Sequence, residues 1–234
     1  MGQGMRRRLA KFVTAGLAAG LLAAAAPAPA RAADVDAEVL AEINFARAHP
    51  QDYARKLMLQ PVSDWERGLA PQDDPAAFAE AVAFLERQAP LPPLSPDDRL
   101  AAAAIEHVEA QGTAGEIGHE GPDGERFDAR LRRHGLEDQA TAGENIAYGP
   151  ARPGDVVREL IIDSGVPGRG HRRNIFYPAF AEAGVACGPH RDYGAMCVMD
   201  FASPAPEAAT WRLADLGPAA CPTRSLLYRL LVCR

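Results

Sequence analysis

Hydrophobic residues recur every three or four positions in several stretches of the chain, which is the spacing of one face of an α-helix. This periodicity predicts helices over residues 37–48, 50–59, 75–88, 96–111, 127–134 and 156–162. The first two are separated at Pro50, because the residue before a proline is pushed out of the helical region. Helix-capping residues are expected at Asp36, Ser95 and Asp155, whose side chains can accept a first-turn N–H.

The pattern changes near the end of the chain to two apolar runs joined by a turn. Residues 184–201 predict an antiparallel hairpin whose connection lies between Pro189 and Gly194. Residues 144–148 predict another strand or the start of a helix. Helices before, between and around late strands indicate a layered α/β/α domain.

The first part of the chain has a different composition from the rest. A basic run, Arg6 to Arg8 with Lys11, precedes an apolar stretch from Phe12 to Ala26 and then small residues. This order predicts a secretory signal peptide over residues 1–32, cut after Ala32 or Ala30. A retained membrane anchor is the other interpretation, but the apolar core is short and rich in alanine. We expect a secreted or cell-envelope protein with no transmembrane span after processing.

The remaining sequence predicts one domain followed by a tail. Residues 203–234 are rich in proline and alanine, and discounting them together with the signal peptide leaves about 170 residues, which is enough for one hydrophobic core. The formal net charge of −6 and the pI near 5.5 argue against nucleic acid as a partner.

Export would make the four cysteines candidates for disulfide bonds. They are Cys187, Cys197, Cys221 and Cys233. Three pairings are possible, and pairing of neighbours would close two short loops, with Cys187 and Cys197 joined across the predicted hairpin. A zinc site is the alternative, but the sequence has no Cys-x-x-Cys spacing.

Two histidines and two carboxylates stand out as candidate functional residues. His119 lies in Gly-His-Glu-Gly, Glu144 in Gly-Glu-Asn-Ile, Asp163 at the end of a helical pattern, and His171 in Gly-His-Arg-Arg-Asn-Ile. Such a set can hold a divalent metal or exchange protons, because imidazole titrates near neutrality and a nearby carboxylate fixes its tautomer. The spacing alone does not choose between these uses.

Other polar residues are expected to be structural. His107, in the middle of the helix over 96–111, is interpreted as a boundary residue and not as a ligand. The three arginines of the helix over 127–134 are interpreted as a solvated face. They are Arg130, Arg132 and Arg133.

The order of these segments over residues 37–202 resembles the CAP superfamily (cysteine-rich secretory proteins, antigen 5 and plant pathogenesis-related proteins), and especially its bacterial secreted branch. The resemblance implies a three-layer α/β/α sandwich with a mainly antiparallel central sheet and an insertion around residues 61–93. It also implies that Asn44 and Arg47 bond the chain internally.

The same resemblance implies a polar cleft built by two histidines and two acids. His119, His171 and Glu144 match the family's positions, and in several members the histidines bind a divalent metal such as Zn²⁺. The second acid departs from the family, which often has aromatic-x-x-Glu where this chain has Leu-Ile-Ile and Asp163.

Three functions follow from this resemblance. The first is an extracellular binding module whose partner is a small hydrophobic ligand or another extracellular protein, with or without a metal. The second is a metal-assisted or acid/base hydrolase, for which Ser164 is the nearby serine. The third is a structural domain of the cell envelope. Binding is favoured over hydrolysis, because two histidines leave a metal short of the usual three protein ligands of catalytic zinc.

Overall fold

The computed structural model describes residues 30–59, 74–136 and 141–203, with side chains from Val35 onward. The predicted signal peptide up to residue 29 and the tail from residue 204, with Cys221 and Cys233, lie outside these residues. The elements in chain order are α1 (Ala30–Ala48), α2 (Pro50–Leu59), α4 (Pro75–Arg87), β1 (Ser95–Pro96), α5 (Asp98–Ala114), the 3-10 helix η1 (Pro122–Gly124), α6 (Phe127–Arg133), β2 (Ala142–Tyr148), α7 (Pro153–Ile162), α8 (Gly170–Ile175), β3 (Glu182–His190) and β4 (Gly194–Ala202).

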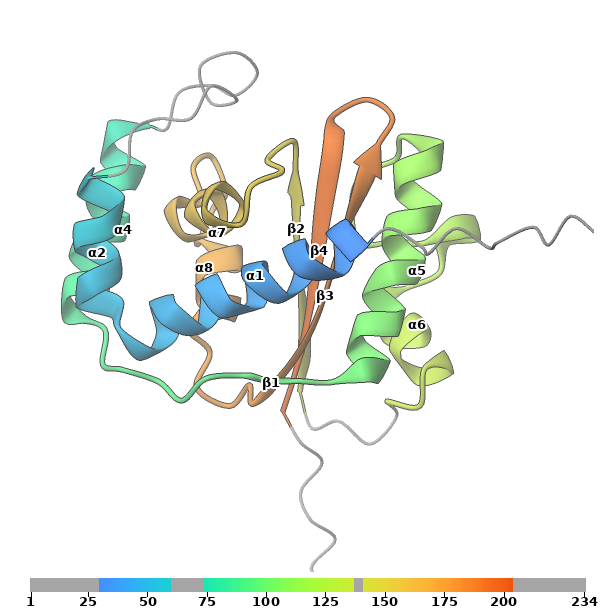
Figure 1. Cartoon of the computed structure of the whole chain (residues 1–234), viewed down its shortest axis with the longest axis horizontal. Coiled ribbons are helices and arrows are strands. Elements are labelled where there is room, and N and C mark those ends of the chain that lie inside the picture. The colour runs from blue at the N-terminus through green and yellow to red at the C-terminus, as the bar shows by residue number, and fades with distance from the viewer. Residues whose placement is uncertain (1–29, 60–73, 137–140, 204–234) are drawn as a thin grey trace, which may run out of the picture.

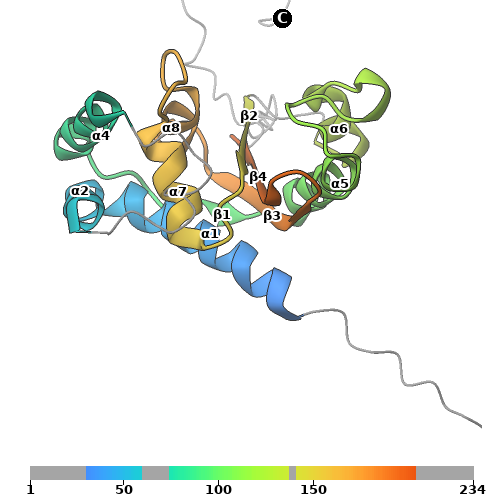
Figure 2. The same ribbon diagram turned by 90° about the horizontal axis from the view of Figure 1, so that it is seen from above.

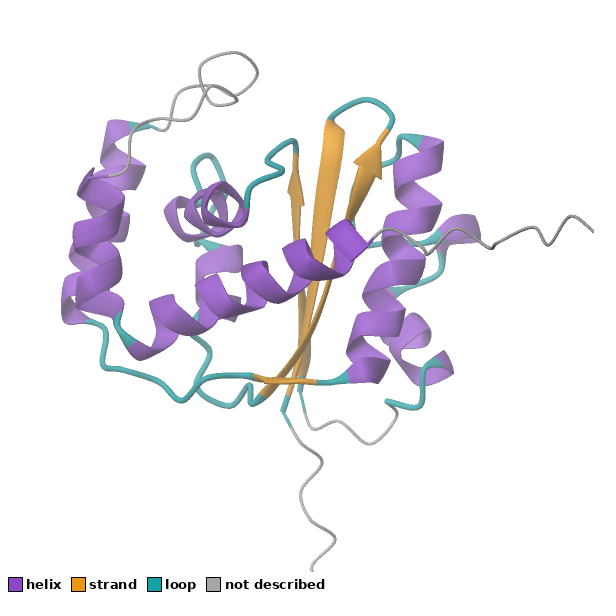
Figure 3. Ribbon diagram, viewed as in Figure 1, coloured by secondary structure: helices purple, strands orange, loops and turns teal. Residues whose placement is uncertain are grey.

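A four-stranded sheet in the order β1-β3-β4-β2 forms the middle layer (Figure 1). Both β2 and β3 pair with β4 in antiparallel fashion, and only the short β1 runs parallel to its neighbour β3. Helices α5 and α6 lie on one side of the sheet, and α1, α7 and α8 lie on the other, with α2 and α4 packed outside them (Figures 2 and 3). The predicted three-layer α/β/α sandwich with a mainly antiparallel sheet is confirmed.

Side chains along the strands alternate between these two helical layers, as the pleat requires. The cross-strand pair Ile146 and Val198 packs beneath α5, whereas Ala147 and Cys197 face the larger core on the side of α1 and α7. Helix α5 crosses β3 so closely at Gly184 that an added Cβ would lie 2.0 Å from a backbone nitrogen of the helix. A side chain at this position would therefore separate the two layers.

The predicted helices and the hairpin are present, but α1 begins at Ala30, seven residues before the predicted start, and the three expected caps are wrong. Asp36 lies inside α1, where its carboxylate accepts the N–H of Cys187 at 2.7 Å. Ser95 pairs with β3 as part of β1, so that α5 begins later and Asp97 caps it. Asp155 lies in the first turn of α7, which starts two residues earlier. Contacts with β3 explain the first two differences.

The expected internal role of Asn44 and Arg47 is confirmed. Asn44 exchanges two hydrogen bonds with the backbone of Leu94, at 2.7 and 3.0 Å. The buried guanidinium of Arg47 donates to the carbonyls of Ile175 at 2.6 Å and Phe180 at 3.1 Å. Burial lowers the pKa of Arg47 to about 10. These bonds tie α1 to segments more than 40 residues away.

The predicted disulfide across the hairpin is also confirmed. Cys187 of β3 and Cys197 of β4 are bonded, with their Cα atoms 4.1 Å apart. The two residues are register partners in the sheet, so the bond joins strands that are already paired. Within the ranges that the structure describes, no helix is long and apolar enough to cross a membrane.

Candidate functional site

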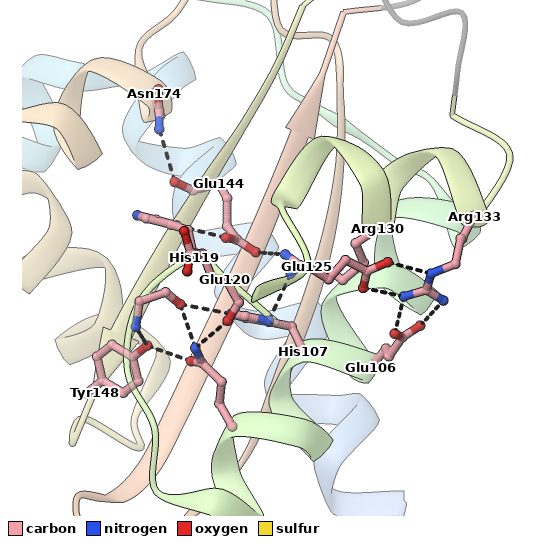
Figure 4. Close-up of polar contacts among 12 residues, drawn as sticks. Glu106, His107, His119, Glu120, Glu125, Arg130, Arg133, Glu144, Tyr148 and Asn174 are labelled. Carbon is pink, nitrogen blue, oxygen red and sulfur yellow. Dashed lines mark hydrogen bonds and ion pairs between the residues drawn. The ribbon is translucent and has the colours of Figure 1, made fainter. Parts of the chain in front are cut away.

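His119 lies on the loop between α5 and η1, and hydrogen bonds from surrounding side chains hold this loop in place. Gln111 donates to the carbonyls of Gly118 at 2.8 Å and Glu120 at 3.2 Å. The hydroxyl of Tyr148 accepts the N–H of Gly118 at 2.9 Å and donates to Gln111 at 2.8 Å (Figure 4). The backbone on both sides of His119 is therefore fixed, while its side chain is 55% exposed.

Glu144 reaches this imidazole from β2 and is almost fully buried, with its side chain 2% exposed. Its Oε1 accepts the Nδ1–H of His119 at 2.8 Å, and its Oε2 accepts from Nη2 of Arg130 (Figure 4). Because the carboxylate only accepts, the neutral imidazole carries its proton on Nδ1 and its lone pair on Nε2. Nε2 is therefore the atom that His119 can offer to a ligand.

A second layer of this network lies deeper, where Arg130 and His107 are both buried. Nη1 of Arg130 donates to Nδ1 of His107 at 2.9 Å, and Nε2 of His107 donates to the carbonyl of Gly118 at 3.0 Å. Both ring nitrogens are therefore used in the neutral form, and burial lowers the pKa of His107. The network runs from the His119 loop through α5 and α6 to Glu144.

This network corrects two expectations from the sequence. Arg130 is not part of a solvated face, because α6 turns this one arginine towards α5 and Glu144 while Arg132 and Arg133 form ion pairs nearer the surface. His107 is not a boundary residue but is 1% exposed and fully hydrogen-bonded. No local pattern distinguishes Arg130 from its neighbours, since its partner lies on a distant strand.

Asp163 and His171 form a second pair, which is held mainly by backbone groups. Asp163 ends α7 in the left-handed region, with φ 56° and ψ 43°. Its Oδ1 accepts the Nδ1–H of His171 at 2.7 Å, and its Oδ2 accepts the backbone N–H groups of His171 at 2.9 Å and Arg172 at 3.4 Å. The short aspartate side chain thus pairs with the histidine, and Nε2 of His171 again carries the lone pair.

Two asparagines join the two pairs. Asn145 of β2 donates to the carbonyl of His171 at 3.0 Å. Asn174 of α8 donates to the side-chain oxygen of Asn145 at 2.9 Å. It also donates to the carbonyl of Glu144 at 3.3 Å, as Figure 4 shows. The asparagines of Gly-Glu-Asn-Ile and Gly-His-Arg-Arg-Asn-Ile therefore connect β2 to α8, a role that the sequence analysis did not assign to them.

The side chains of these two pairs offer few free ligand atoms to a metal ion. Within the described parts of the chain, no group of three or more His, Cys, Asp or Glu side chains is arranged to hold a metal ion. The carboxylates of Glu144 and Asp163 are occupied by hydrogen bonds to the imidazoles. What remains is the Nε2 atoms of His119 and His171, so a metal held by both would keep positions open for water or a ligand.

A separate, mostly apolar pocket of about 290 Å³ lies at the tip of the hairpin. It is lined by Val35, Ala151, Cys187, Gly188, Pro189, Gly194, Ala195, Met196 and Cys197. None of the four candidate residues contributes to its wall.

The chain matches the model of the cysteine-rich secretory protein (CAP) family over residues 40–201. No curated protein matches the chain in sequence. Several solved structures are similar to the chain at low sequence identity. An outer surface protein from Borrelia burgdorferi shares 20% sequence identity with a TM-score of 0.41, and the similarity covers 48% of this chain and 79% of that protein.

Two further solved structures cover more of this chain but less of their own. An extracellular protein containing an SCP domain from Bacillus anthracis shares 21% identity over 62% of this chain and 45% of its own, with a TM-score of 0.40. A cysteine-rich secretory protein from Staphylococcus aureus shares 15% sequence identity, with a TM-score of 0.38. The similarity covers 62% of this chain and 40% of that protein. The chain thus spans less than half the length of these two proteins. Because the family model matches well over half of the sequence, the chain belongs to the cysteine-rich secretory protein family.

Proposed function

We propose that this protein is an extracellular binding module in which His119 and His171 hold one divalent metal ion, such as Zn²⁺, through their Nε2 atoms. One observation carries the proposal: each imidazole is bonded through Nδ1 to a buried carboxylate, at 2.8 Å from Glu144 and 2.7 Å from Asp163. Carboxylates bonded in this way orient metal-binding histidines and raise their basicity.

A metal at this position would act as a Lewis acid towards an oxygen atom of a bound molecule. Two protein ligands leave the other coordination positions to water or to that molecule. The partially exposed side chains, 55% for His119 and 25% for His171, leave room for a ligand to approach from solvent. This arrangement favours reversible binding.

The nature of the ligand and the location belong to the same proposal. The apolar pocket beside the disulfide is the place where a small hydrophobic molecule would fit, and it is separate from the two histidines. An oxidising compartment, as expected for a secreted or cell-envelope protein, would keep Cys187 and Cys197 bonded.

Hydrolysis has less support than binding. The hydroxyl of Ser164, the serine next to Asp163, accepts the N–H of Asp74 at 3.1 Å at the start of α4. Among the described residues no hydrogen bond joins this hydroxyl to an imidazole, which a serine nucleophile would need for activation.

Calorimetric titration of Zn²⁺ into the wild type, His119→Ala and His171→Ala tests the proposal. Each variant should lose at least about tenfold in affinity, because one of two protein ligands is removed. Binding to the wild type should also weaken in acid, since protonated imidazole has no lone pair to donate.

His134→Ala is the matched control for this titration. Its imidazole is also bonded to a carboxylate, Glu106, but through Nε2 at 2.8 Å and on the outer side of α6. This variant should bind Zn²⁺ like the wild type. Unchanged affinity in both site variants, or an equal loss in all three, would contradict the metal proposal.

A further inference from the structure

Asp200 is a buried carboxyl group that neither histidine pair uses directly. It lies on β4 as the register partner of Glu144 on β2, so the two acidic side chains point to the same face of the sheet. Asp200 is 0% exposed, and among the described residues neither of its oxygens has a hydrogen-bond donor. An acceptor in such a position is costly unless it finds a proton.

The surroundings of Asp200 contain one cation and one further acid. Glu144 faces it from β2 and Arg130 from α6, while His107 of α5 lies behind Arg130 and is bonded to it. On the other side, the register partner in β3 is Gly184, which has no side chain. Two buried carboxyl groups therefore lie near a single guanidinium.

The terminal nitrogens of the Arg130 guanidinium are already used in hydrogen bonds to other groups. Nη2 of Arg130 donates to Glu144 and Nη1 donates to His107. Its Nε is buried and bonds neither Asp200 nor any other described residue. With both acids ionised, the site would hold a net negative charge that burial makes unfavourable. One proton on the pair removes this charge and turns an unpaired acceptor into a donor.

We propose that Asp200 is a neutral carboxylic acid in the folded protein, that it donates a hydrogen bond to Glu144, and that it thereby acts as a positioning residue for His119. Glu144 would then accept from three sides: from His119, from Arg130 and from Asp200. Burial, followed by the charge of Glu144, raises the pKa of Asp200 well above its usual range, which agrees with this assignment.

The effect on metal binding rests on the proposed function, whereas the hydrogen bond itself does not. A Glu144 side chain held in this way keeps its Oε1 directed at the Nδ1–H of His119, so that the lone pair remains on Nε2. Asp200 acts through Glu144 and not by contact with the metal.

Infrared difference spectra of the metal-free protein at neutral pH test the protonation state. The carbonyl band of a neutral carboxylic acid should be present in the wild type and absent in Asp200→Asn. Asp155→Asn is the control, because Asp155 is also a buried aspartate but is paired with Arg152 at 2.7 Å. That variant should leave the band unchanged.

Zinc titration then tests the positioning role. Asp200→Asn keeps an N–H donor for Glu144, so its affinity should stay within about threefold of the wild type. Asp200→Val removes the donor and should weaken Zn²⁺ binding by about 10–100-fold, as loss of an outer-shell partner does. Should Asp200→Val fail to fold, the infrared band in the wild type and Asp200→Asn still decides the protonation state.

The outcomes separate the two proposals. Absence of the neutral-acid band from the wild type would mean that Asp200 is ionised and would overturn the proposal. Equal loss of zinc affinity in Asp200→Asn and Asp200→Val would mean that a hydrogen-bond donor at this position does not position His119. Presence of the band in a protein that binds no zinc would support the hydrogen bond and contradict the metal site.

Discussion

The two His–acid pairs differ in what holds the acid. Glu144 is 25 residues from its histidine and depends on side chains from other elements, above all the buried Arg130 of α6. Asp163 is eight residues from its histidine and depends on two backbone N–H groups at the start of α8. One acid is fixed by charges gathered from distant parts of the chain, and the other by the local path of the backbone.

This difference predicts how each pair fails. The Glu144 pair should be sensitive to removal of a buried charge, because the remaining buried partners would be left uncompensated. The Asp163 pair should be sensitive to loss of an acceptor at a strained backbone position, and much less to a change of charge. The expected losses of stability can therefore be ranked for variants of the two acids and of the residues that bond them.

Arg130→Met should have the largest effect. It keeps most of the volume but leaves the buried Glu144 without its ion-pair partner, and breaking a buried ion pair in this way costs about 3–5 kcal/mol. Urea unfolding at neutral pH measures the loss. Arg132→Met, on the same helix but with a side chain 55% exposed and paired with Asp128, should change stability by less than about 0.5 kcal/mol. Equal losses in the two variants would remove the distinction between the pairs.

Asp163→Ala should have an intermediate effect, with a loss of about 1–3 kcal/mol, because the N–H groups of His171 and Arg172 lose their acceptor. Asp163→Asn keeps an acceptor and suits the left-handed backbone, so it should lose less than the alanine variant. Asp123→Ala is the control, since Asp123 is exposed and has a similar φ of 59°. The same unfolding measurement applies, and a loss no larger than that of Asp123→Ala would show that the hydrogen bonds contribute nothing.

The difference between the two pairs also explains how much of the site could be predicted from the sequence. His171 and Asp163 follow from local signals, a helix end and a glycine turn, and their pairing lies within eight residues. The Gly-Glu-Asn-Ile segment indicated Glu144 as a candidate, and the predicted hairpin indicated the disulfide between Cys187 and Cys197. The supporting residues Arg130 and Asp200 were missed because their roles depend on the docking of α6 and on the register of β2 with β4.

The expected caps failed for a related reason. Asp36 and Ser95 have the right chemistry to start a helix, but both are used by β3 instead. A local propensity of about 1 kcal/mol is readily overridden by tertiary contacts. Sequence patterns therefore predicted the elements and the candidate residues better than the contacts that hold them.

Glu106→Gln should have the smallest effect on stability. It tests an outer contact between α5 and α6, in contrast to the buried contact that Arg130 makes between the same helices. On the outer side of α5, Glu106 accepts from Arg133 (Figure 4). It also accepts from His134 at the end of α6. These bonds, led by that from Arg133, lower the pKa of Glu106 to about 2 from 4.5. Because the folded pKa is depressed, the contribution to stability is present above pH 4.5 and is lost as the pH falls towards 2.

The difference in unfolding free energy between the wild type and Glu106→Gln should therefore be constant near neutrality and shrink to zero between about pH 4.5 and 2. It should stay below about 1 kcal/mol even at its largest, because the side chain is 37% exposed and solvent screens the charge. Salt should reduce it further, which it should not do for the buried Arg130. Glu109→Gln, an exposed position on the same helix, controls for the substitution itself. A difference that persists unchanged in acid would mean that the outer contact stabilises α6 through packing and not through charge.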